Sequence, residues 1–142
     1  MNRSRLFFPS AVTRTAVPKR CVSCETQNVL SLILSTQELR SKARPEIKAY
    51  PNNFEDYDTI FVGYPNWWGT MPMCMFTLLE KYDLTGRTVI PFCTNEGSGM
   101  GSSEHDLKNL CKGAAVKAGL SIHGAESAES ESKVAAWAKK SV

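Results

Sequence analysis

The sequence predicts an α/β protein in which a doubly wound parallel sheet carries helices on both faces. From residue 57 onward, apolar strand-like segments alternate with segments of helical periodicity in the order β-α-β-α-β-α, which is typical of a parallel sheet. The strand segments are nearly continuous apolar runs, as expected of strands buried on both faces. Two of them end abruptly in loops rich in aromatic residues or glycine. In open parallel sheets, ligands bind at the carboxyl ends of the strands.

The chain of 142 residues is long enough to form one domain with a substantial core. It contains no apolar run long enough to span a membrane, and we expect a cytoplasmic protein. The five cysteines are an odd number without the regular spacing of a disulfide framework. Cys21 and Cys24 have the spacing of a redox motif or of half a zinc site. Because this pair stands alone, without a nearby histidine, we predict no metal site.

Charge is spread unevenly along the chain. Residues 1–50 carry a net charge of +6 and residues 51–142 carry −3, which together make the formal net charge of +3. The chain has no acidic residue before Glu25. Such a start is compatible with an organelle transit peptide, but we favour a basic and poorly structured N-terminus. Nothing interleaves aromatic residues with this charge as in a nucleic-acid site, so we expect no nucleic-acid partner.

The first element expected is a short strand over Arg5–Phe8, which Pro9 ends. Residues 26–43 allow two interpretations. Apolar residues at i, i+4 spacing favour a helix capped by Thr26, whereas the run 29–34 could equally be a buried strand. Prolines and paired asparagines then predict a loop over residues 43–53.

The next strand, within residues 59–62, runs into the segment Gly63 to Gly69. This segment holds three aromatic residues within the five positions 64–68. Its adjacent tryptophans either pack, one buried and one exposed, or form a platform for a flat, electron-poor ring, because aromatic faces favour offset stacking. Thr70 is expected to cap the following helix, with Pro72 near its first position. Residues 73–82 are apolar nearly all round, which predicts a helix buried against the sheet.

A second glycine-containing loop follows the strand at residues 87–93. Pro91 is unusual inside that strand because proline removes a hydrogen-bond donor. Residues 94–101 contain three glycines in five positions, which predicts tight turns or a close approach to another group. Ser102 or Ser103 is expected to cap the next helix, with Asp106 closing a capping box from Ser103. The inward stripe of that helix comprises Leu107, Leu110 and Cys111.

The last strand is expected within residues 116–123. Ser130 is expected to cap the final helix, whose inward-facing residues have i, i+3, i+4 spacing: Val134, Trp137 and Ala138. His105 and His123 are isolated, so we assign them no role in catalysis or metal binding. Cys93 is interpreted as a strand residue. No general acid, base or nucleophile has an evident partner, and we predict no catalytic residue.

The segment from Tyr57 to Pro72 closely resembles the flavin-facing loop of flavodoxins and flavodoxin-like FMN proteins. The resemblance continues through Pro91–Gly101 and covers about residues 42–142, whereas residues 1–41 match far less well. It implies a flavodoxin-like sheet of strand order 2-1-3-4-5 and FMN as the cofactor. It also implies that Trp67 or Trp68 stacks on the isoalloxazine ring, and that residues 94–99 offer backbone groups to its pyrimidine side. The cofactor-binding residues implied in these two loops are Tyr64, Pro65, Asn66, Trp67, Trp68, Gly69, Thr94, Asn95, Glu96, Gly97, Ser98 and Gly99.

The phosphate-binding loop is where the sequence departs from this family. In flavodoxins, a loop with hydroxyl groups and glycine follows the first strand and wraps the FMN phosphate. Here Ser10, Thr13 and Thr15 are the hydroxyl candidates, the usual glycine is missing, and Pro18 cuts short any helix that begins there. The loop is a degraded or rearranged version, or no version at all, which leaves open whether the N-terminal part of the fold is complete.

The resemblance implies an FMN-binding electron-transfer protein or small flavin oxidoreductase, in which the redox chemistry belongs to the flavin. One alternative is an NAD(P)H-dependent quinone or flavin reductase of the same fold. Another is an interaction module that has lost its cofactor together with its phosphate loop. The expected partner is a redox protein or a small-molecule electron acceptor, with no membrane partner, and the chain is expected to be a monomer or a homodimer.

Overall fold

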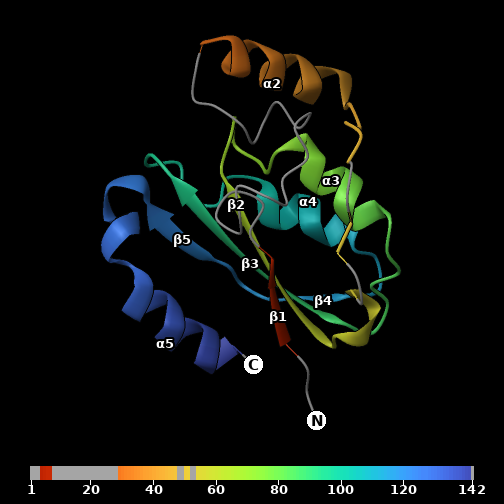
Figure 1. Ribbon diagram of the computed structural model, residues 1–142, viewed down its shortest axis with the longest axis vertical. Helices are drawn as coiled ribbons and strands as arrows, with labels where there is room; N and C mark the ends of the chain where they lie inside the picture. The colour runs from red at the N-terminus through yellow and green to blue at the C-terminus, as the bar shows by residue number, and fades with distance from the viewer. Residues whose placement is uncertain (1–3, 8–28, 48–49, 52–53, 142) are drawn as a thin grey trace.

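A parallel sheet organises the fold (Figure 1). The computed structural model describes residues 4–7, 29–47, 50–51 and 54–141. Within these residues, β1, β2 and β3 lie side by side and run parallel, and β4 and β5 both pair in parallel with β3. The strands are β1 (Ser4–Phe7), β2 (Thr59–Pro65), β3 (Thr88–Asn95), β4 (Ala115–Val116) and β5 (Leu120–His123).

The strand order agrees in part with the expected order 2-1-3-4-5. β1 is the expected first strand, and β2 and β3 occupy the third and fourth positions. β4 and β5 pair with successive stretches of β3 and together fill the fifth. In the described part of the chain, no strand lies beyond β1. The run 29–34 instead belongs to helix α2 (Val29–Ser41), so a helix is confirmed in that region and the strand interpretation is wrong. Its expected cap, Thr26, lies outside the described residues.

Pro91 lies inside β3 without breaking the sheet, because it faces a gap in the neighbouring strand. β4 pairs with Thr88 and Val89, and β5 pairs from Phe92 onward. The carbonyls of Arg87 and Val89 accept hydrogen bonds from the β4 side. Since backbone groups alternate sides along a parallel strand, Pro91 also faces that side, opposite the break between β4 and β5. The missing N–H therefore costs no hydrogen bond of the sheet.

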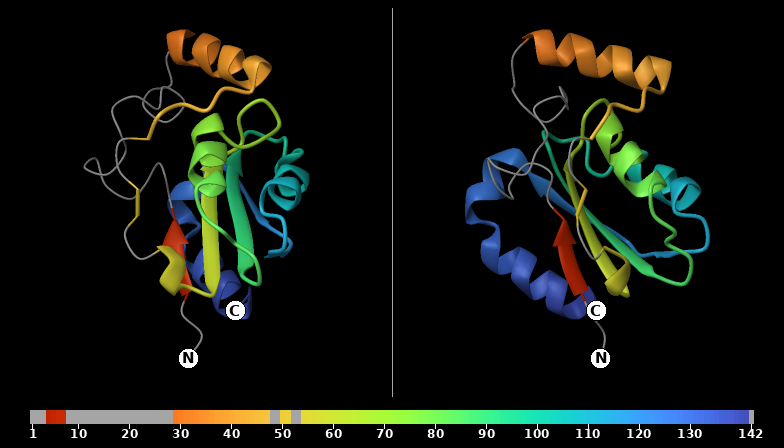
Figure 2. Two further views of the ribbon diagram at one scale, coloured as in Figure 1. Left: turned by 90° about the vertical axis from the view of Figure 1, so that its right-hand side faces the viewer. Right: turned by 45° about the vertical axis from the view of Figure 1, so that its right-hand side comes forward.

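Helices cover both faces of the sheet, as the sequence predicts. Helices α3 (Met73–Glu80) and α4 (Ser103–Leu110) lie on one face, and α5 (Glu131–Ser141) lies on the other (Figures 1 and 2). Side chains of the strands alternate between these faces. The larger core, under α3 and α4, includes Ile60, Val62, Tyr64, Val89, Cys93 and Leu107. The smaller core consists of Phe61, Ile90 and Phe92, against which Trp137 and Ala138 of α5 pack.

Helix α2 covers neither face of the sheet. It lies across the carboxyl ends of the strands in all three views of the ribbon (Figures 1 and 2). The segment after α2 is tied to α3 by Arg44, whose guanidinium donates to both carboxylate oxygens of Glu80 at 2.6 and 2.7 Å. Short 3₁₀ helices, η1 (Phe54–Asp56) and η2 (Gly124–Glu129), complete the described part. None of its helices is long and apolar enough to cross a membrane.

The expected helix caps are wrong in detail, because the hydroxyl groups have other partners. Pro72, not Thr70, precedes α3, and the Thr70 hydroxyl donates to Asp106 of α4 at 2.5 Å. Ser102 occupies the N-cap position of α4 without a side-chain cap, and no box forms between Ser103 and Asp106. Ser103 instead donates to the Met100 carbonyl at 2.5 Å. Ser130 precedes α5, but its hydroxyl donates backward to the Ser127 carbonyl.

Candidate functional site

Two loops meet at the carboxyl ends of β2 and β3. We call residues 65–72 the aromatic loop and residues 96–102 the glycine loop. The Asn66 side-chain nitrogen donates to the Gly99 carbonyl at 2.7 Å and to the Ser98 hydroxyl at 3.1 Å. At the other end, the Gly69 carbonyl accepts from both the backbone N–H and the hydroxyl of Ser102, at 2.6 and 3.0 Å. The two loops are therefore neighbours, joined by hydrogen bonds at both ends.

A tight reversal at the tip of the aromatic loop presents Trp68. The backbones of Trp67 and Thr70 exchange hydrogen bonds of 2.9 and 3.1 Å. The two residues between them, Trp68 and Gly69, have φ of +57° and +84°, as in a type I′ turn. A positive φ is uncommon for a bulky residue and costs conformational energy. The turn leaves Trp68 55% exposed, the large hydrophobic side chain most open to solvent in the described part.

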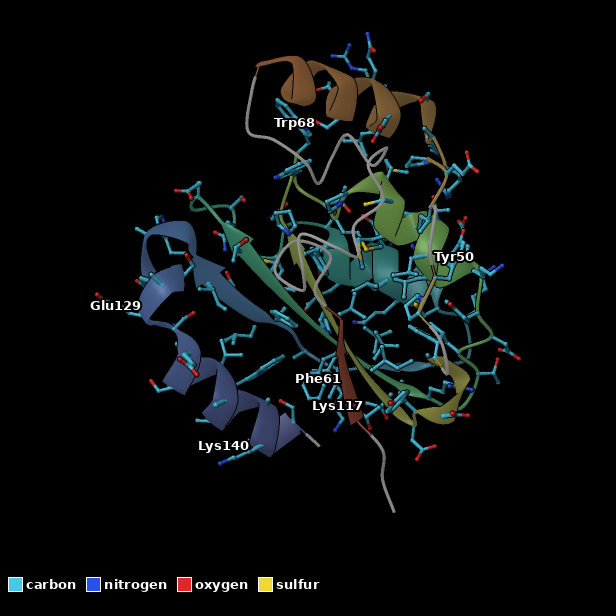
Figure 3. All side chains as sticks on the ribbon, in the orientation of Figure 1. Tyr50, Phe61, Trp68, Lys117, Glu129 and Lys140 are labelled. Atoms are coloured by element: carbon cyan, nitrogen blue, oxygen red, sulfur yellow. The ribbon has the colours of Figure 1, made fainter. Side chains whose placement is uncertain are left out.

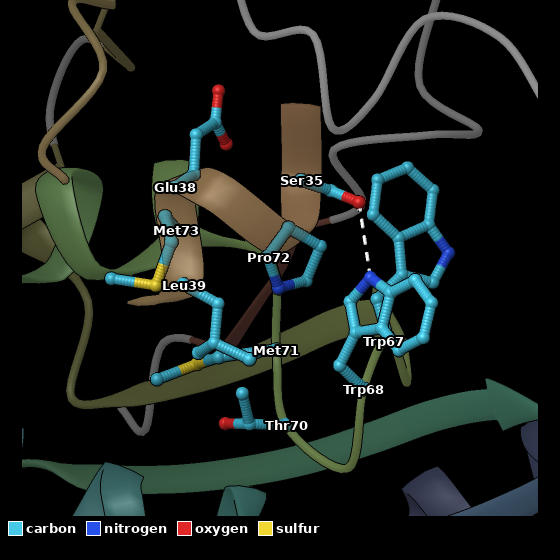
Figure 4. Close-up of a pocket in the computed structure, with 9 residues that line it drawn as sticks. All are labelled: Ser35, Glu38, Leu39, Trp67, Trp68, Thr70, Met71, Pro72 and Met73. Carbon is cyan, nitrogen blue, oxygen red and sulfur yellow. Dashed lines mark hydrogen bonds between the residues drawn. The ribbon is translucent and has the colours of Figure 1, made fainter. Parts of the chain in front are cut away.

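The indole of Trp68 reaches α2. Its Nε1–H donates to the Ser35 hydroxyl at 3.1 Å, and Figure 4 shows this bond with the Trp67 ring beside it. Figure 3 places Trp68 directly under α2, away from Phe61 in the sheet and from α5. One indole edge is thus hydrogen-bonded to a helix, while more than half of the Trp68 surface stays exposed to solvent.

Asn95 shapes the glycine loop. Its side-chain oxygen accepts from the backbone N–H groups of Gly97 and Gly99 at 2.9 and 3.0 Å. Its side-chain nitrogen donates to the Ser121 hydroxyl and the Ile122 carbonyl at 2.8 and 3.1 Å, which ties the loop to β5. Both glycines have positive φ, and nothing lies within 4 Å of where a Cβ would be. The loop therefore exposes open backbone surface that glycine alone adopts without strain.

Some candidate residues offer a ligand only their backbone. The Tyr64 side chain lies in the larger core and donates to the Ser103 hydroxyl at 2.7 Å, so it does not flank a ring in the loops. The Asn95 amide is occupied by its four hydrogen bonds. Pro65, Trp67, Gly69 and Thr94 are partly buried, and Glu96, Gly97 and Ser98 are exposed. Ser10, Thr13 and Thr15 lie outside the described residues.

The side chain of Asn66 has an acceptor atom that the described residues leave unused. Its side-chain oxygen is buried and has no hydrogen-bond partner among the described residues. Its amide nitrogen is occupied by the glycine loop, which fixes the orientation of the group. Burying a polar oxygen without a partner is unfavourable, so this position suits a ligand that donates a hydrogen bond.

The sequence missed three residues of the site. Ser35 could not be assigned to the site because the sequence around it was compatible with either a helix or a strand. Ser102 and Asp106 were interpreted only as capping residues, although they bind Gly69 and Thr70 of the aromatic loop. Among the described residues, no group of three or more His, Cys, Asp or Glu side chains is placed to hold a metal ion.

We predict that the protein loses stability in alkali. Burial raises the pKa of the Cys93 and Cys111 thiols from 9.0 to about 11, and burial also raises the pKa of the Tyr64 phenol. Well below pH 9 these groups are neutral in the folded and unfolded chains, and their contribution is fully present. As pH rises through the folded-state values, the unfolded chain ionises first and stability is lost.

Urea unfolding between pH 8 and pH 11 tests this expectation. The free energy of unfolding should fall steadily above pH 9. The double variant Cys93→Ala/Cys111→Ala should show a shallower fall, whatever its stability at pH 8. An equally steep fall in the double variant would contradict the assignment to the thiols.

The paired loops present an exposed aromatic side chain and open glycine backbone, and comparison with known proteins identifies relatives of the chain. Residues 27–141 match the family model described as Flavodoxin. A proposed flavoprotein from Bacteroides uniformis is 26% identical with a TM-score of 0.73, covering 97% of this chain and 98% of that one. A proposed flavoprotein from Bacteroides eggerthii is 33% identical with a TM-score of 0.63, covering 76% of this chain. The present chain spans 66% of the length of that relative.

A third structure shows a more distant likeness in fold. It is a flavoprotein from Lactobacillus acidophilus in complex with FMN, 18% identical with a TM-score of 0.63, and it covers 97% of this chain and 99% of that one. No curated protein matches the chain.

Proposed function

Because the chain belongs to the flavodoxin family, we propose that it binds FMN between the aromatic and glycine loops and carries electrons as a small flavoprotein. The observation that carries this proposal is the exposed side chain of Trp68, on a loop that is hydrogen-bonded to a glycine loop with open backbone surface. The complex of the Lactobacillus acidophilus protein with FMN supports the choice of cofactor.

The residues present fit such a group. Trp68 offers an aromatic face, and aromatic faces favour offset stacking with flat rings. The buried oxygen of Asn66, which lacks a partner in the described part, suits a hydrogen-bond donor on a ring edge. Gly97 and Gly99 let backbone groups approach closely, since no side chain stands in the way. Ser10, Thr13 and Thr15 remain the proposed phosphate ligands.

The chain's own contribution is to bind, orient and shield the ring. Bound FMN would supply the redox chemistry, and the protein tunes it through the groups around it. Trp68 and Trp67 would cover the ring and limit its contact with water. Asn66 would orient one edge, and its bonds to Ser98 and Gly99 keep the two loops at a constant separation. The Cys93 thiol is buried and stays neutral at physiological pH, which suits a packing role.

A titration of the purified protein with FMN tests the proposal. The wild-type protein is expected to quench flavin emission and to give structured flavin absorbance bands. The double variant Trp67→Ala/Trp68→Ala should bind at least roughly tenfold more weakly, since each stacking contact contributes about 0.5–1.5 kcal/mol beyond buried area. Trp137→Phe is the matched control, because Trp137 packs against Phe61 and Phe92 on the far face of the sheet.

Two outcomes would redirect the assignment. Unchanged FMN emission at micromolar protein would exclude an electron carrier that uses FMN. The remaining interpretation would be an interaction module that binds no cofactor. Steady-state reduction of quinones or free flavin by NAD(P)H would instead favour a reductase of the same fold. As partner we propose a redox protein or a small-molecule electron acceptor. We also propose a cytoplasmic location, supported by cysteines that follow no disulfide framework.

A further inference from the structure

We propose that Ser35 of α2 is a positioning residue: its hydroxyl holds the Trp68 indole at the angle at which a bound flavin ring meets it. This inference rests on the proposed function and deepens it, because it makes α2 part of the cofactor site. Neither the sheet nor the loops alone would then determine the geometry of the stacking platform.

The first step is that one face of α2 contacts the aromatic loop. Ser35, Glu38 and Leu39 have the i, i+3, i+4 spacing of a single helix face. Together with residues of the aromatic loop they line a cavity of only about 10 Å³, which holds no more than one water molecule (Figure 4). The helix therefore packs closely on the loop that carries both tryptophans.

The second step is that Trp68 needs an external support. Its backbone has φ of +57°, which is unfavourable for a side chain of this size. Trp68 is 55% exposed, so packing against α2 and the aromatic loop covers only part of it. The bond to Ser35 is the one hydrogen bond recorded for the indole within the described residues. Without it, the ring would be free to rotate about its side-chain torsions.

The third step is that the hydrogen-bond acceptor is shielded from solvent. Ser35 is only 5% exposed, so water competes weakly for its hydroxyl and the hydrogen bond is correspondingly stronger. The segment that follows α2 contacts α3 through Arg44, which pairs with Glu80 and lies over the Phe76 ring at 5.2 Å. Helix α2 therefore presents a buried acceptor to the indole.

The experiment is a double-mutant cycle in the full-length protein, with FMN as the probe. Ser35→Ala is expected to raise the Kd for FMN roughly three- to tenfold, as loss of one hydrogen bond allows. Trp68→Phe keeps an aromatic face but has no N–H, so Ser35→Ala should have no further effect in that background. Ser35→Thr restores the hydroxyl and should recover most of the affinity. Ser41→Ala is the control, since the Ser41 hydroxyl bonds only to carbonyls of its own helix.

A second readout is independent of the cofactor. In the NMR spectrum of the protein without FMN, the Trp68 indole proton is identified by its absence in Trp68→Phe. It should exchange with water faster in Ser35→Ala than in the wild type or in Ser41→Ala. A merely structural role of Ser35 would lower thermal stability without changing this one indole signal.

The outcomes separate the two proposals. If the wild type binds FMN but Ser35→Ala raises the Kd equally in both backgrounds, the positioning role is wrong and the proposed function stands. Unchanged indole exchange in Ser35→Ala would also overturn it. If the wild type binds no FMN, the proposed function fails, and the role of Ser35 in cofactor binding fails with it.

Discussion

Gly101→Ala is expected to pull the two site loops apart and to remove tight flavin binding. A Cβ on Gly101 would lie 2.2 Å from the Gly69 carbonyl oxygen and 2.7 Å from its carbon. Both are backbone atoms, so no flexible side chain can move aside. The same carbonyl accepts two hydrogen bonds from Ser102, and displacing it would weaken both. The clash therefore falls on the contact that joins the loops.

The expected loss in stability is large for a single methyl group. Gly101 has φ of +56°, where alanine costs about 1–2 kcal/mol, and overpacking typically adds about 1–3 kcal/mol. Together these give about 2–5 kcal/mol, a large share of the 5–15 kcal/mol typical of a whole domain at about 25 °C. Urea unfolding measures the stability, and FMN titration should show a Kd raised by more than roughly tenfold.

Gly86→Ala is the matched control for this prediction. Gly86 also has a positive φ, of +76°, but nothing lies within 4 Å of its hypothetical Cβ, and it lies outside both loops. Alanine at position 86 therefore has only the conformational cost of a positive φ and causes no steric clash. Equal losses of stability in the two variants, with FMN affinity retained by Gly101→Ala, would show that the close approach of the loops is unimportant.

Local patterns in the sequence were sufficient to place the two loops side by side. The apolar runs of β2 and β3 indicate strands buried on both faces, and such strands in a parallel sheet bring their carboxyl ends to one edge. The period of two along β2 also places Ile60, Val62 and Tyr64 on one face. That period would have predicted the buried position of Tyr64, which the resemblance to flavin-facing loops obscured.

The position of α2 could not be predicted for a different reason. Val29, Leu30, Ile33 and Leu34 satisfy a helix and a buried strand equally well, because short apolar runs carry no decisive periodicity. The choice depends on what surrounds the segment in the fold. The contact between Ser35 and Trp68 joins positions 33 residues apart and leaves no local trace in the sequence.

The hydrogen-bond partners of hydroxyl groups were the least predictable feature of the fold. Thr70, Ser103 and Ser130 all occur where a helix cap is reasonable, yet each donates to a partner outside the expected cap. A hydroxyl can rotate to any acceptor within reach, so its partner is determined by tertiary packing. The same freedom makes Asp106, which accepts from Thr70 and Ser102, a link between α4 and the aromatic loop.

Asn95→Ala is expected to be the most damaging polar substitution in the described part of the chain. Asn95 is 6% exposed and makes four hydrogen bonds that join β3, β5 and the glycine loop. Alanine would remove the side-chain amide and leave the groups that bond to it without a partner, at a site that water reaches poorly. We expect a loss of about 2–4 kcal/mol in the free energy of unfolding. Each buried polar group left without a hydrogen-bond partner costs about 1–3 kcal/mol, and partial relaxation of the structure reduces the total. Asn109→Ala, on the exposed side of α4, is the control.

Asn95→Asp separates the shape of the glycine loop from the stability of the sheet. Aspartate keeps an oxygen for the N–H groups of Gly97 and Gly99 but loses the donor to the Ile122 carbonyl. If the loop shape is what a flavin requires, Asn95→Asp should lose stability like Asn95→Ala while holding FMN more tightly than Asn95→Ala does. The comparison is made by urea unfolding and FMN titration of both variants. Equal FMN affinity in the two would mean that the oxygen of Asn95 does not shape the loop for the ligand, and that its role is confined to joining β3 to β5.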